Sequence, residues 1–168
     1  MAELLTHVLV AYAVLTIAGW RVDWLTPRWV ALGTVGALLP DLNQLGRLLS
    51  GPTIERMLGV PFAYGALHTV GGIVLLAALV ALFFAQRRRA FAVLVAGGLS
   101  HLLLDALKIH ADGRAGTWLY PLTWWRHPAP DLYVSADSRV LAAALVGATA
   151  VLVAGRYRTA RREGSHAD

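Results

Sequence analysis

The sequence predicts an all-α, polytopic membrane helix bundle of about five spans, and three observations favour this fold class. Of the 168 residues, 57% are hydrophobic and only 15% are charged, whereas soluble domains carry roughly 25% charged residues. A soluble globule of this length could not bury so much apolar surface, because its surface-to-volume ratio is too high. Several apolar runs approach the roughly 20 residues that a helix needs to cross a bilayer. Cysteine is absent, which excludes disulfides and thiolate metal sites.

Five apolar segments account for the predicted spans. The first lacks the basic start and the small-residue cleavage site of a signal peptide, so it counts as a span. The second is close to the lower length limit for a span, so it is the one open to being half-buried or tilted. In chain order, the predicted spans are 4–20, 29–42, 67–85, 90–107 and 139–155.

The first four spans can be grouped as two repeated helical hairpins, with the fifth helix added. In each hairpin a histidine, His7 or His68, begins one apolar run, and an aspartate, Asp41 or Asp105, ends the next. The glycine pair at 97–98 favours close helix approach in the fourth span over a phosphate-binding loop. Residues 1–156 are therefore predicted to form a single transmembrane domain with an outward aromatic loop near 108–138. Residues 157–168 are predicted to form a basic cytoplasmic tail.

The arginines predict the orientation of the spans. Arg87 to Arg89 separate the third and fourth spans, Arg21 and Arg28 lie between the first two, and an arginine-rich stretch follows the fifth. With five spans all three segments lie on one side, which the positive-inside rule places in the cytoplasm. The chain is then a multi-pass inner-membrane protein whose amino terminus faces outward and whose carboxyl terminus is cytoplasmic. Because each basic cluster adjoins an apolar run instead of covering a soluble face, no nucleic-acid partner is expected.

A small set of ionisable residues lies inside or at the ends of the spans, where a charge costs about 2.5 kcal/mol or more. These residues are His7, Asp41, His68, His101 and Asp105. In the predicted orientation all five lie at the outer membrane face. His101 and Asp105 are four residues apart and share one helix face. Histidine and aspartate without cysteine suit a divalent metal, with zinc preferred and manganese or magnesium as alternatives. A single membrane histidine is more often a hydrogen bonder between helices, but five such groups at one depth favour a metal site.

The predicted outward loop carries an aromatic cluster, TWLYPLTWWRH, in which Pro121 blocks a regular helix. Tryptophan and tyrosine suit an interfacial aromatic belt, and the alternative is a lid or lipid-binding loop over a site. Basic residues on this loop are candidates for binding a phosphate, in the case of arginine through a bidentate fork. The alternative for each of them is ordinary interfacial snorkelling. The predicted substrate-binding residues are Lys108, Arg114, Arg126 and Trp124.

Several short motifs together resemble those of a known membrane family. They are Thr6-His7, Leu39-Pro40-Asp41, His68-Thr69, the run SHLLLD at 100–105, and Tyr120-Pro121. Over roughly residues 5–125 they resemble the LexA-regulated inner-membrane family of metal-dependent hydrolases, which is distantly similar to zinc-dependent phospholipase C and to single-strand nucleases. The resemblance implies that Asp41, His68, His101 and Asp105 hold one metal and that His7 binds a second, with Asp105 as a bridge. Asn43 stands where the family often has an acidic residue, which removes one ligand.

The leading hypothesis is a membrane-embedded, metal-dependent hydrolase of phosphoesters, lipid-linked ones above all. It would use metal-activated water at the outer membrane face, with Asp105 and Asp41 as catalytic residues. Its expected partners are membrane lipid and an amphiphilic phosphoester substrate. The alternatives are a non-enzymatic protein with a structural metal site and a divalent-cation transporter, whose ligands would lie nearer the midplane. The basic tail could also bind anionic lipid. The sequence does not predict an oligomeric state.

Overall fold

The computed structural model describes residues 2–135 and 137–164, and within this range every regular element is a helix. The α-helices and the two 3₁₀ helices, η1 and η2, are α1 (Ala2–Gly19), α2 (Pro27–Gly36), η1 (Pro40–Arg47), α3 (Gly51–Leu58), η2 (Tyr64–His68), α4 (Val70–Ala81), α5 (Arg87–Ala106) and α6 (Ser138–Gly164). The predicted all-α class is therefore confirmed.

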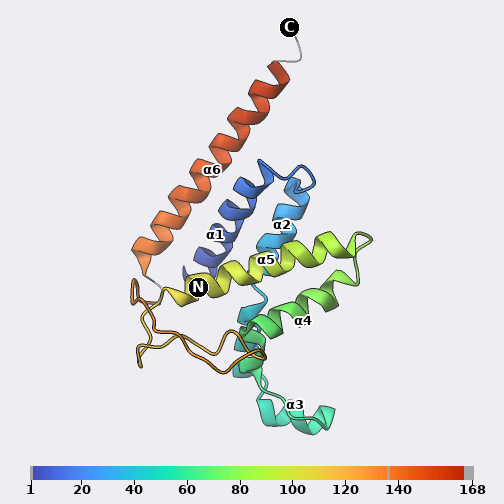
Figure 1. Ribbon diagram of the computed structural model, residues 1–168, viewed down its shortest axis with the longest axis vertical. Coiled ribbons are helices and arrows are strands. Elements are labelled where there is room, and N and C mark those ends of the chain that lie inside the picture. The colour runs from blue at the N-terminus through green and yellow to red at the C-terminus, as the bar shows by residue number, and fades with distance from the viewer. Residues whose placement is uncertain (1, 136, 165–168) are drawn as a thin grey trace.

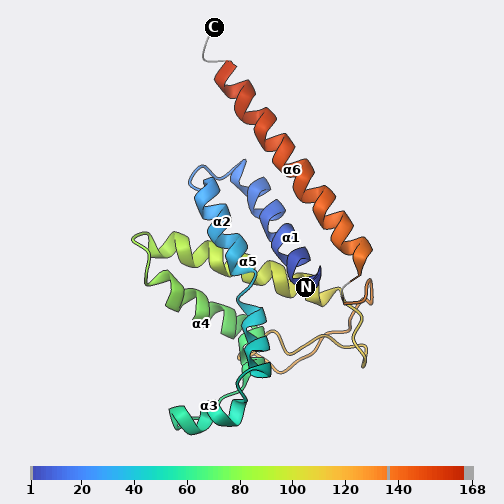
Figure 2. The same cartoon turned by 180° about the vertical axis from the view of Figure 1, so that it is seen from behind.

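Five of the α-helices are arranged as two packed pairs and one long helix, α6. Helices α1 and α2 pack together, α4 and α5 pack together, and α6 lies along α1 (Figures 1 and 2). Helix α2 also packs on α5 and so joins the two pairs. One buried cluster at this junction contains Leu39, Ala77 and Leu94, and a second contains Leu15 and Val93.

Glycines allow α2 and α5 to approach closely. A Cβ atom added at Gly36 would lie 2.5 Å from the carbonyl oxygen of Leu94, and one added at Gly97 would overlap the carbonyl oxygen of Gly33. Small residues let helix backbones come into direct contact, as is common between membrane helices. The predicted close approach at Gly97 is confirmed, and it fixes the position of α5 against the end of α2.

The five-span bundle is not confirmed. Among the described residues, only Arg87–Ala106 and Ser138–Ala160 are long and apolar enough to cross a membrane, with mean hydropathies of 1.4 and 1.8. The second predicted span, 29–42, is interrupted, because α2 ends at Gly36 and η1 begins at Pro40. With 10 residues, α2 is only about 15 Å long, against roughly 30 Å of hydrocarbon.

The third predicted span, 67–85, is interrupted by a helix cap. Thr69 separates η2 from α4, because its hydroxyl oxygen accepts a hydrogen bond from the Gly72 N–H at 3.1 Å. Such a cap satisfies one of the N–H groups that a helix start leaves free. The remaining helix, α4, has 12 residues and is about 18 Å long.

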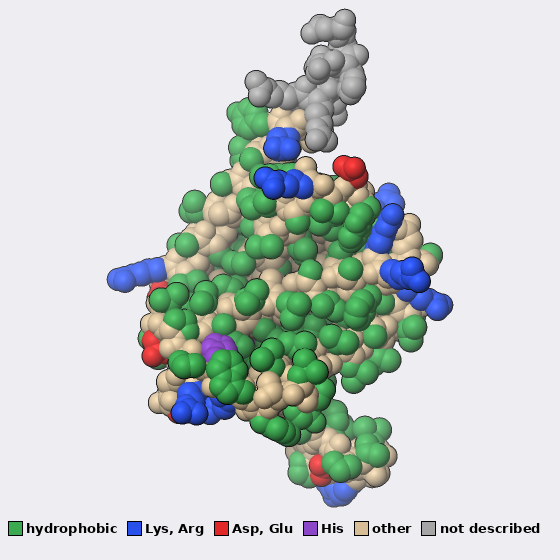
Figure 3. All heavy atoms as spheres, viewed as in Figure 1, with side chains coloured by type: hydrophobic (Ala, Val, Ile, Leu, Met, Phe, Trp, Pro, Cys, Tyr) green, Lys and Arg blue, Asp and Glu red, His purple; other side chains and the backbone are tan. Residues whose placement is uncertain are grey.

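The basic segments meet at one end of the molecule. The Arg158 guanidinium on α6 lies 5.0 Å from the ring centroid of Trp20, and the Arg89 guanidinium on α5 lies 5.5 Å from that of Trp24. Both tryptophans belong to the connection from α1 to α2. In Figure 3, hydrophobic side chains cover most of the visible face and the Lys and Arg side chains lie at its edges.

Helix α6 continues to Gly164, so part of the segment predicted as a tail, 157–168, is helical. Residues 165–168 of that prediction lie outside the described residues.

The predicted outward loop, 108–138, contains no helix before α6 among its described residues. It runs back across the start of α4, where the Val70 N–H donates to the Trp118 carbonyl at 2.7 Å and the Gly71 N–H donates to the Tyr120 carbonyl at 3.0 Å. The loop therefore satisfies N–H groups in the first turn of α4. The absence of a regular helix around Pro121 agrees with the prediction.

Candidate metal centre

All five ionisable residues predicted from the sequence lie together, although they come from four different elements. Helix α1 supplies His7, η1 supplies Asp41, η2 supplies His68, and α5 supplies His101 and Asp105. His7, His101 and Asp105 form one group of potential ligands, and Asp41, His68 and His101 form another. Within each group the potential ligand atoms lie within 4.8 Å of one another. The structure thus brings together the residues that the sequence grouped.

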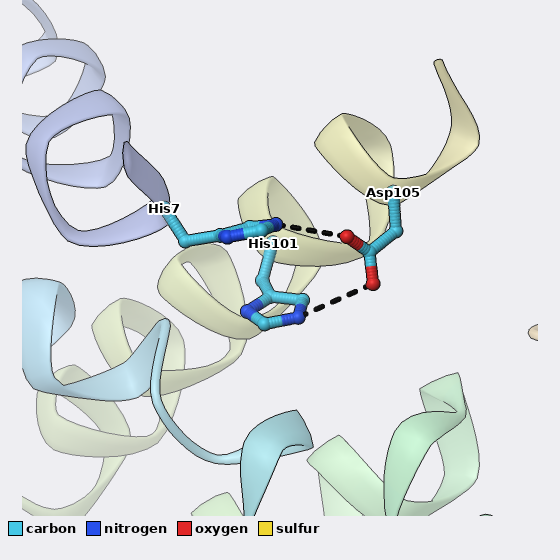
Figure 4. Close-up of side chains that lie close together, drawn as sticks. All are labelled: His7, His101 and Asp105. Atoms are coloured by element: carbon cyan, nitrogen blue, oxygen red, sulfur yellow. Dashed lines mark hydrogen bonds and ion pairs between the residues drawn. The ribbon is translucent and has the colours of Figure 1, made fainter. Parts of the chain in front are cut away.

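The carboxylate of Asp105 is at the centre of this arrangement (Figure 4). Its Oδ1 lies 2.9 Å from Nε2 of His7. Its Oδ2 lies 2.7 Å from Nε2 of His68 and 3.4 Å from Nε2 of His101. The two oxygens therefore face different imidazoles, which is the arrangement that a carboxylate bridging two ions requires.

Each of the three imidazoles directs its other nitrogen to a backbone carbonyl. The Nδ1 atoms of His7, His68 and His101 lie 2.7, 3.3 and 2.7 Å from the carbonyl oxygens of Glu3, Pro40 and Ala37, respectively. A carbonyl only accepts, so in each contact Nδ1–H is the donor. This fixes the tautomer, and Nε2 of the neutral ring then carries a lone pair.

The local sequence explains why the Ala37 carbonyl is free for His101. In a turn at this point, the Ala37 carbonyl would accept a hydrogen bond from the N–H of residue 40. Residue 40 is a proline, which has no N–H. The next N–H, of Asp41, donates to the Leu38 carbonyl at 3.2 Å. The end of α2 thus supplies an acceptor that points at α5.

The chemistry of these donors fits a divalent cation. With Nδ1–H committed to a carbonyl, three Nε2 lone pairs converge on an ionised carboxylate, which also offers only lone pairs. Acceptors that face one another need a shared cation. The Lys108 ammonium group serves Oδ1 of Asp105, and the lone pairs of the rings need protons or a metal ion. Metal-binding histidines characteristically donate their second nitrogen to a carbonyl or carboxylate in this way.

Ring packing and burial fix the orientation of the histidines. The His7 and His101 rings stack with centroids 3.8 Å apart, and His68 meets His101 edge-on at 5.1 Å. His7 and His101 are each 1% exposed. A centre this rigid needs little reorganisation on binding an ion, which favours affinity.

Asp41 lies on the more open side of the centre, together with His68. Their side chains are 18% and 20% exposed, compared with 2% for His7 and His101. Oδ1 of Asp41 accepts a hydrogen bond from the Gln44 side chain at 2.8 Å, and its Oδ2 lies 4.0 Å from Nδ1 of His101. The side of the centre formed by η1 and η2 is therefore its more solvent-exposed side.

Of the residues predicted to bind substrate, Lys108 reaches the centre. Its ammonium group is buried and forms ion pairs with Oδ1 of Asp105 and with Glu3. The sequence reasoning missed Glu3, although its place one helical turn before His7 was a usable signal.

The other predicted substrate-binding residues lie elsewhere on the loop. Arg126 holds the loop together, through two bonds to the Asp112 carboxylate at 2.6 and 3.2 Å and one to the Ala115 carbonyl at 2.8 Å. These bonds hold the pKa of Asp112 below its ordinary value. Arg114 is exposed, and Trp124, 74% exposed, lies against Tyr120. Their predicted contact with substrate stays a prediction.

Tyr133 also anchors the loop beside the centre, and the sequence reasoning missed it. Its hydroxyl donates to the Leu104 carbonyl at 2.8 Å. Burial, helped by the nearby charge of Asp105, raises the pKa of Tyr133 to about 12. A small cavity of ≈10 Å³ lies between Tyr133, Glu3 and His7, which is room for about one water molecule.

Comparison with protein families identifies an inner-membrane family. The family model described as YdjM inner membrane protein matches residues 1–166. A match over this length agrees with the inner-membrane family expected from the motifs, whereas the expected LexA regulation and kinship with metal-dependent hydrolases stay predictions. Comparison with curated proteins and with solved structures finds no match.

Proposed function

The chain belongs to the YdjM inner membrane protein family, and we propose, from the geometry of the candidate metal centre, that it is a membrane-embedded, metal-dependent hydrolase of phosphoesters. One observation carries the proposal: three Nε2 atoms converge on the Asp105 carboxylate, while each Nδ1 is committed to a backbone carbonyl. Three histidines and a carboxylate suit zinc best, and manganese or magnesium are the alternatives.

The residues proposed to hold the metal are His7, His68, His101 and Asp105, with Asp41 on the open side as a further ligand or as the base. Since the two oxygens of Asp105 face different imidazoles, the centre has donors for one ion or for a bridged pair. When bound, the metal would lower the pKa of a water molecule and stabilise negative charge on phosphoryl oxygens.

The protein's own groups would bind the substrate and move the proton. Hydrolysis forms a P–O bond to the oxygen of water and breaks the P–O bond to the leaving group. Oδ2 of Asp41 would accept the proton from water and return it to the leaving oxygen. The ammonium group of Lys108, beside Asp105, would pair with a phosphoryl oxygen and hold the substrate over the centre.

The proposed topology places this chemistry at the outer membrane surface. The basic segments gather near Trp20 and Trp24, and the positive-inside rule assigns that end to the cytoplasm. His7 lies near the opposite end of α1, which gives an outward amino terminus and an outward centre. Five crossings of the membrane then require two spans that each consist of two consecutive helices. One span is α2 followed by η1, and the other is η2 followed by α4. The aromatic loop nearby supports a lipid-linked substrate.

The proposal is tested by assaying the purified protein in detergent micelles that contain a phosphatidic acid or a phosphodiester lipid, with zinc, manganese or magnesium. Wild type should release phosphate or alcohol only with metal, and Asp41→Asn should reduce the rate by about 10²–10⁴-fold, as expected for loss of a general base. Asp131→Asn, a matched change at an exposed position of the 108–138 loop, should leave the rate unchanged. Metal-loaded wild type without hydrolysis, or Asp41→Asn with full activity, would refute the hydrolase.

A structural metal site is the second candidate, and the burial of His7 and His101 favours it. Four protein ligands around one ion would close its coordination and exclude water. The absorption spectrum of cobalt-substituted protein distinguishes the two: a catalytic centre should change its spectrum when phosphate is added, and a closed centre should not.

A further inference from the structure

An open groove of ≈970 Å³ lies away from the metal centre, between α1, α2 and α6. Its lining includes Tyr12 and Trp20 of the α1 side, Val30 of α2, and Leu152 and Gly155 of α6. This volume is at the upper end of the about 300–1,000 Å³ typical of ligand sites. Trp20 follows the last turn of α1, whereas His7 is in its second turn, so the groove's far end is about 20 Å from the centre.

The groove is lined mainly by apolar side chains, interspersed with threonines, and it is positively charged at one end. Valine, leucine and alanine side chains line α2 and α6, and Arg156 and Arg158 lie at the far end beside Asp23, the one acidic residue of the lining. Neither arginine forms an ion pair with a residue in the described part of the chain. The Arg158 guanidinium instead lies over the Trp20 ring at 5.0 Å. Two cations against one anion leave a net positive charge beside an apolar wall.

We propose that this groove binds one anionic phospholipid, with its phosphate at Arg156 and Arg158 and an acyl chain along Val30 and Leu152. Guanidinium groups pair with phosphate through two parallel hydrogen bonds, and basic pockets between membrane helices bind anionic headgroups on the cytoplasmic side. The outer wall is Ser138–Ala160, with mean hydropathy 1.8 and only 6% of its most apolar stretch buried. Helix α6 is therefore largely exposed, and in the topology proposed above a lipid of the inner leaflet could reach the groove past it.

The chemistry distinguishes this ligand from an ordinary annular lipid. A zwitterionic headgroup would bring its amine close to the two arginines, which costs electrostatic energy that an anionic headgroup avoids. A fatty chain without a headgroup would leave both guanidinium groups unpaired. An anionic phospholipid satisfies the apolar wall and the charged end together.

The test is a titration followed by native mass spectrometry, using delipidated protein in detergent and two lipids with identical acyl chains, phosphatidylglycerol and phosphatidylethanolamine. Wild type should bind one phosphatidylglycerol in preference to phosphatidylethanolamine. The double variant R156Q/R158Q should bind phosphatidylglycerol roughly 30-fold more weakly, because each basic residue near a membrane surface contributes about five- to sixfold. The matched variant R87Q/R88Q removes the same charge from exposed positions on α5 and should bind like wild type.

A second pair of variants fills the groove without changing any charge. A Cβ atom at Gly155 would face Nε1 of Trp20 at 4.0 Å, whereas one at Gly147, two turns earlier on α6, meets nothing within 4 Å. Gly155→Leu should therefore displace the lipid, and Gly147→Leu should retain it. Both variants should keep the metal content of wild type, which shows that they remain folded.

Three results would overturn the proposal. One is equal binding of the two lipids by wild type. Another is undiminished phosphatidylglycerol binding in both R156Q/R158Q and Gly155→Leu. The third is a lipid-free dimer that Gly155→Leu dissociates, because the groove would then hold a second copy of the chain.

Discussion

Replacing Asp105 by Asn removes the negative charge from the middle of the three imidazoles and keeps the shape of the side chain. In wild type the carboxylate lies within 3.4 Å of Nε2 of His7, His68 and His101. An amide oxygen is a much weaker ligand for a divalent ion than a carboxylate. We therefore expect Asp105→Asn to lose most of the metal affinity while the three histidines remain.

The size of the effect follows from mass action. Metal at a concentration 100 times its Kd raises the free energy of unfolding by about 2.7 kcal/mol. For a chain of 168 residues this corresponds to a rise in Tm of about 5–11 °C. Loss of partners that merely orient a ligand weakens binding by about 10–100-fold, so loss of the central ligand should cost at least 100-fold. The same metal concentration then equals the Kd, and the stabilisation falls to about 0.4 kcal/mol, or roughly 1–2 °C.

The assay is thermal unfolding in detergent, with and without zinc, manganese or magnesium. The readout is the metal-induced rise in Tm within each variant, so a lower stability of metal-free Asp105→Asn does not affect it. Asp112→Asn is the matched control, because it makes the same change on the exposed loop and should keep the full rise. If wild type shows no rise with any of the three metals, or if Asp105→Asn shows the same rise as wild type, the centre does not bind metal through Asp105.

Three further outcomes are expected. Gly97→Ala should lower the free energy of unfolding by about 1–3 kcal/mol, because its Cβ would overlap the Gly33 backbone; thermal unfolding measures this. Arg126→Gln should raise the pKa of Asp112 towards its ordinary value, as read from the carboxyl ¹³C shift. Because the folded-state pKa is lowered, the stability from this pair is present above the unfolded-state pKa and is lost as pH falls through the folded-state pKa. Pro40→Ala should weaken metal binding by about 10–100-fold, because an N–H at position 40 competes with His101 for the Ala37 carbonyl; metal titration measures this.

Each of these outcomes has a matched control. Gly147→Ala meets open space, so it should be neutral or stabilise the helix by up to about 1 kcal/mol. Arg114→Gln should leave the Asp112 titration unchanged, since Arg114 contacts that carboxylate through its backbone N–H, at 3.1 Å, and the substitution keeps this bond. Pro52→Ala, in the first turn of α3, should leave metal binding unchanged. Controls that behave like the test variants would contradict the mechanism in each case.

The convergence of the five ionisable residues could be predicted because such groups are costly inside a membrane and therefore have a reason to be there. The positions of the arginines predicted that all five residues lie at one membrane face. The i, i+4 spacing of His101 and Asp105 predicted that both lie on one face of α5. Lys108 was predicted to bind substrate, whereas its ion pair with Asp105, three residues earlier on the chain, was not predicted. The role of Arg126 depends on how the loop folds back to Asp112, and no local pattern encodes that path.

The span lengths could not be predicted from hydropathy, because a hydropathy average contains no information on where the backbone hydrogen bonds of a helix end. Residues 29–42 and 67–85 are continuously apolar enough to suggest helices, yet the first breaks before Pro40 and the second at Thr69. Both breaks are encoded by ordinary local signals, a residue without an N–H and a hydroxyl that caps a helix. These signals carry little weight in a hydropathy average, which therefore overestimates the length of both helices.

The interrupted second span and the metal centre are the same structural feature. An unbroken helix over 29–42 would have bonded the Ala37 carbonyl to the Asp41 N–H and left it unavailable to His101. Helix α2 ends at Gly36, and Pro40 lies three residues after Ala37. The Ala37 carbonyl is therefore left to accept from Nδ1 of His101, at 2.7 Å. The same break turns Asp41 towards the centre on η1. The proposed hydrolase would need fixed imidazoles and one open side, and a broken helix end supplies both. In that proposal the LPD motif shapes the backbone as well as supplying a ligand.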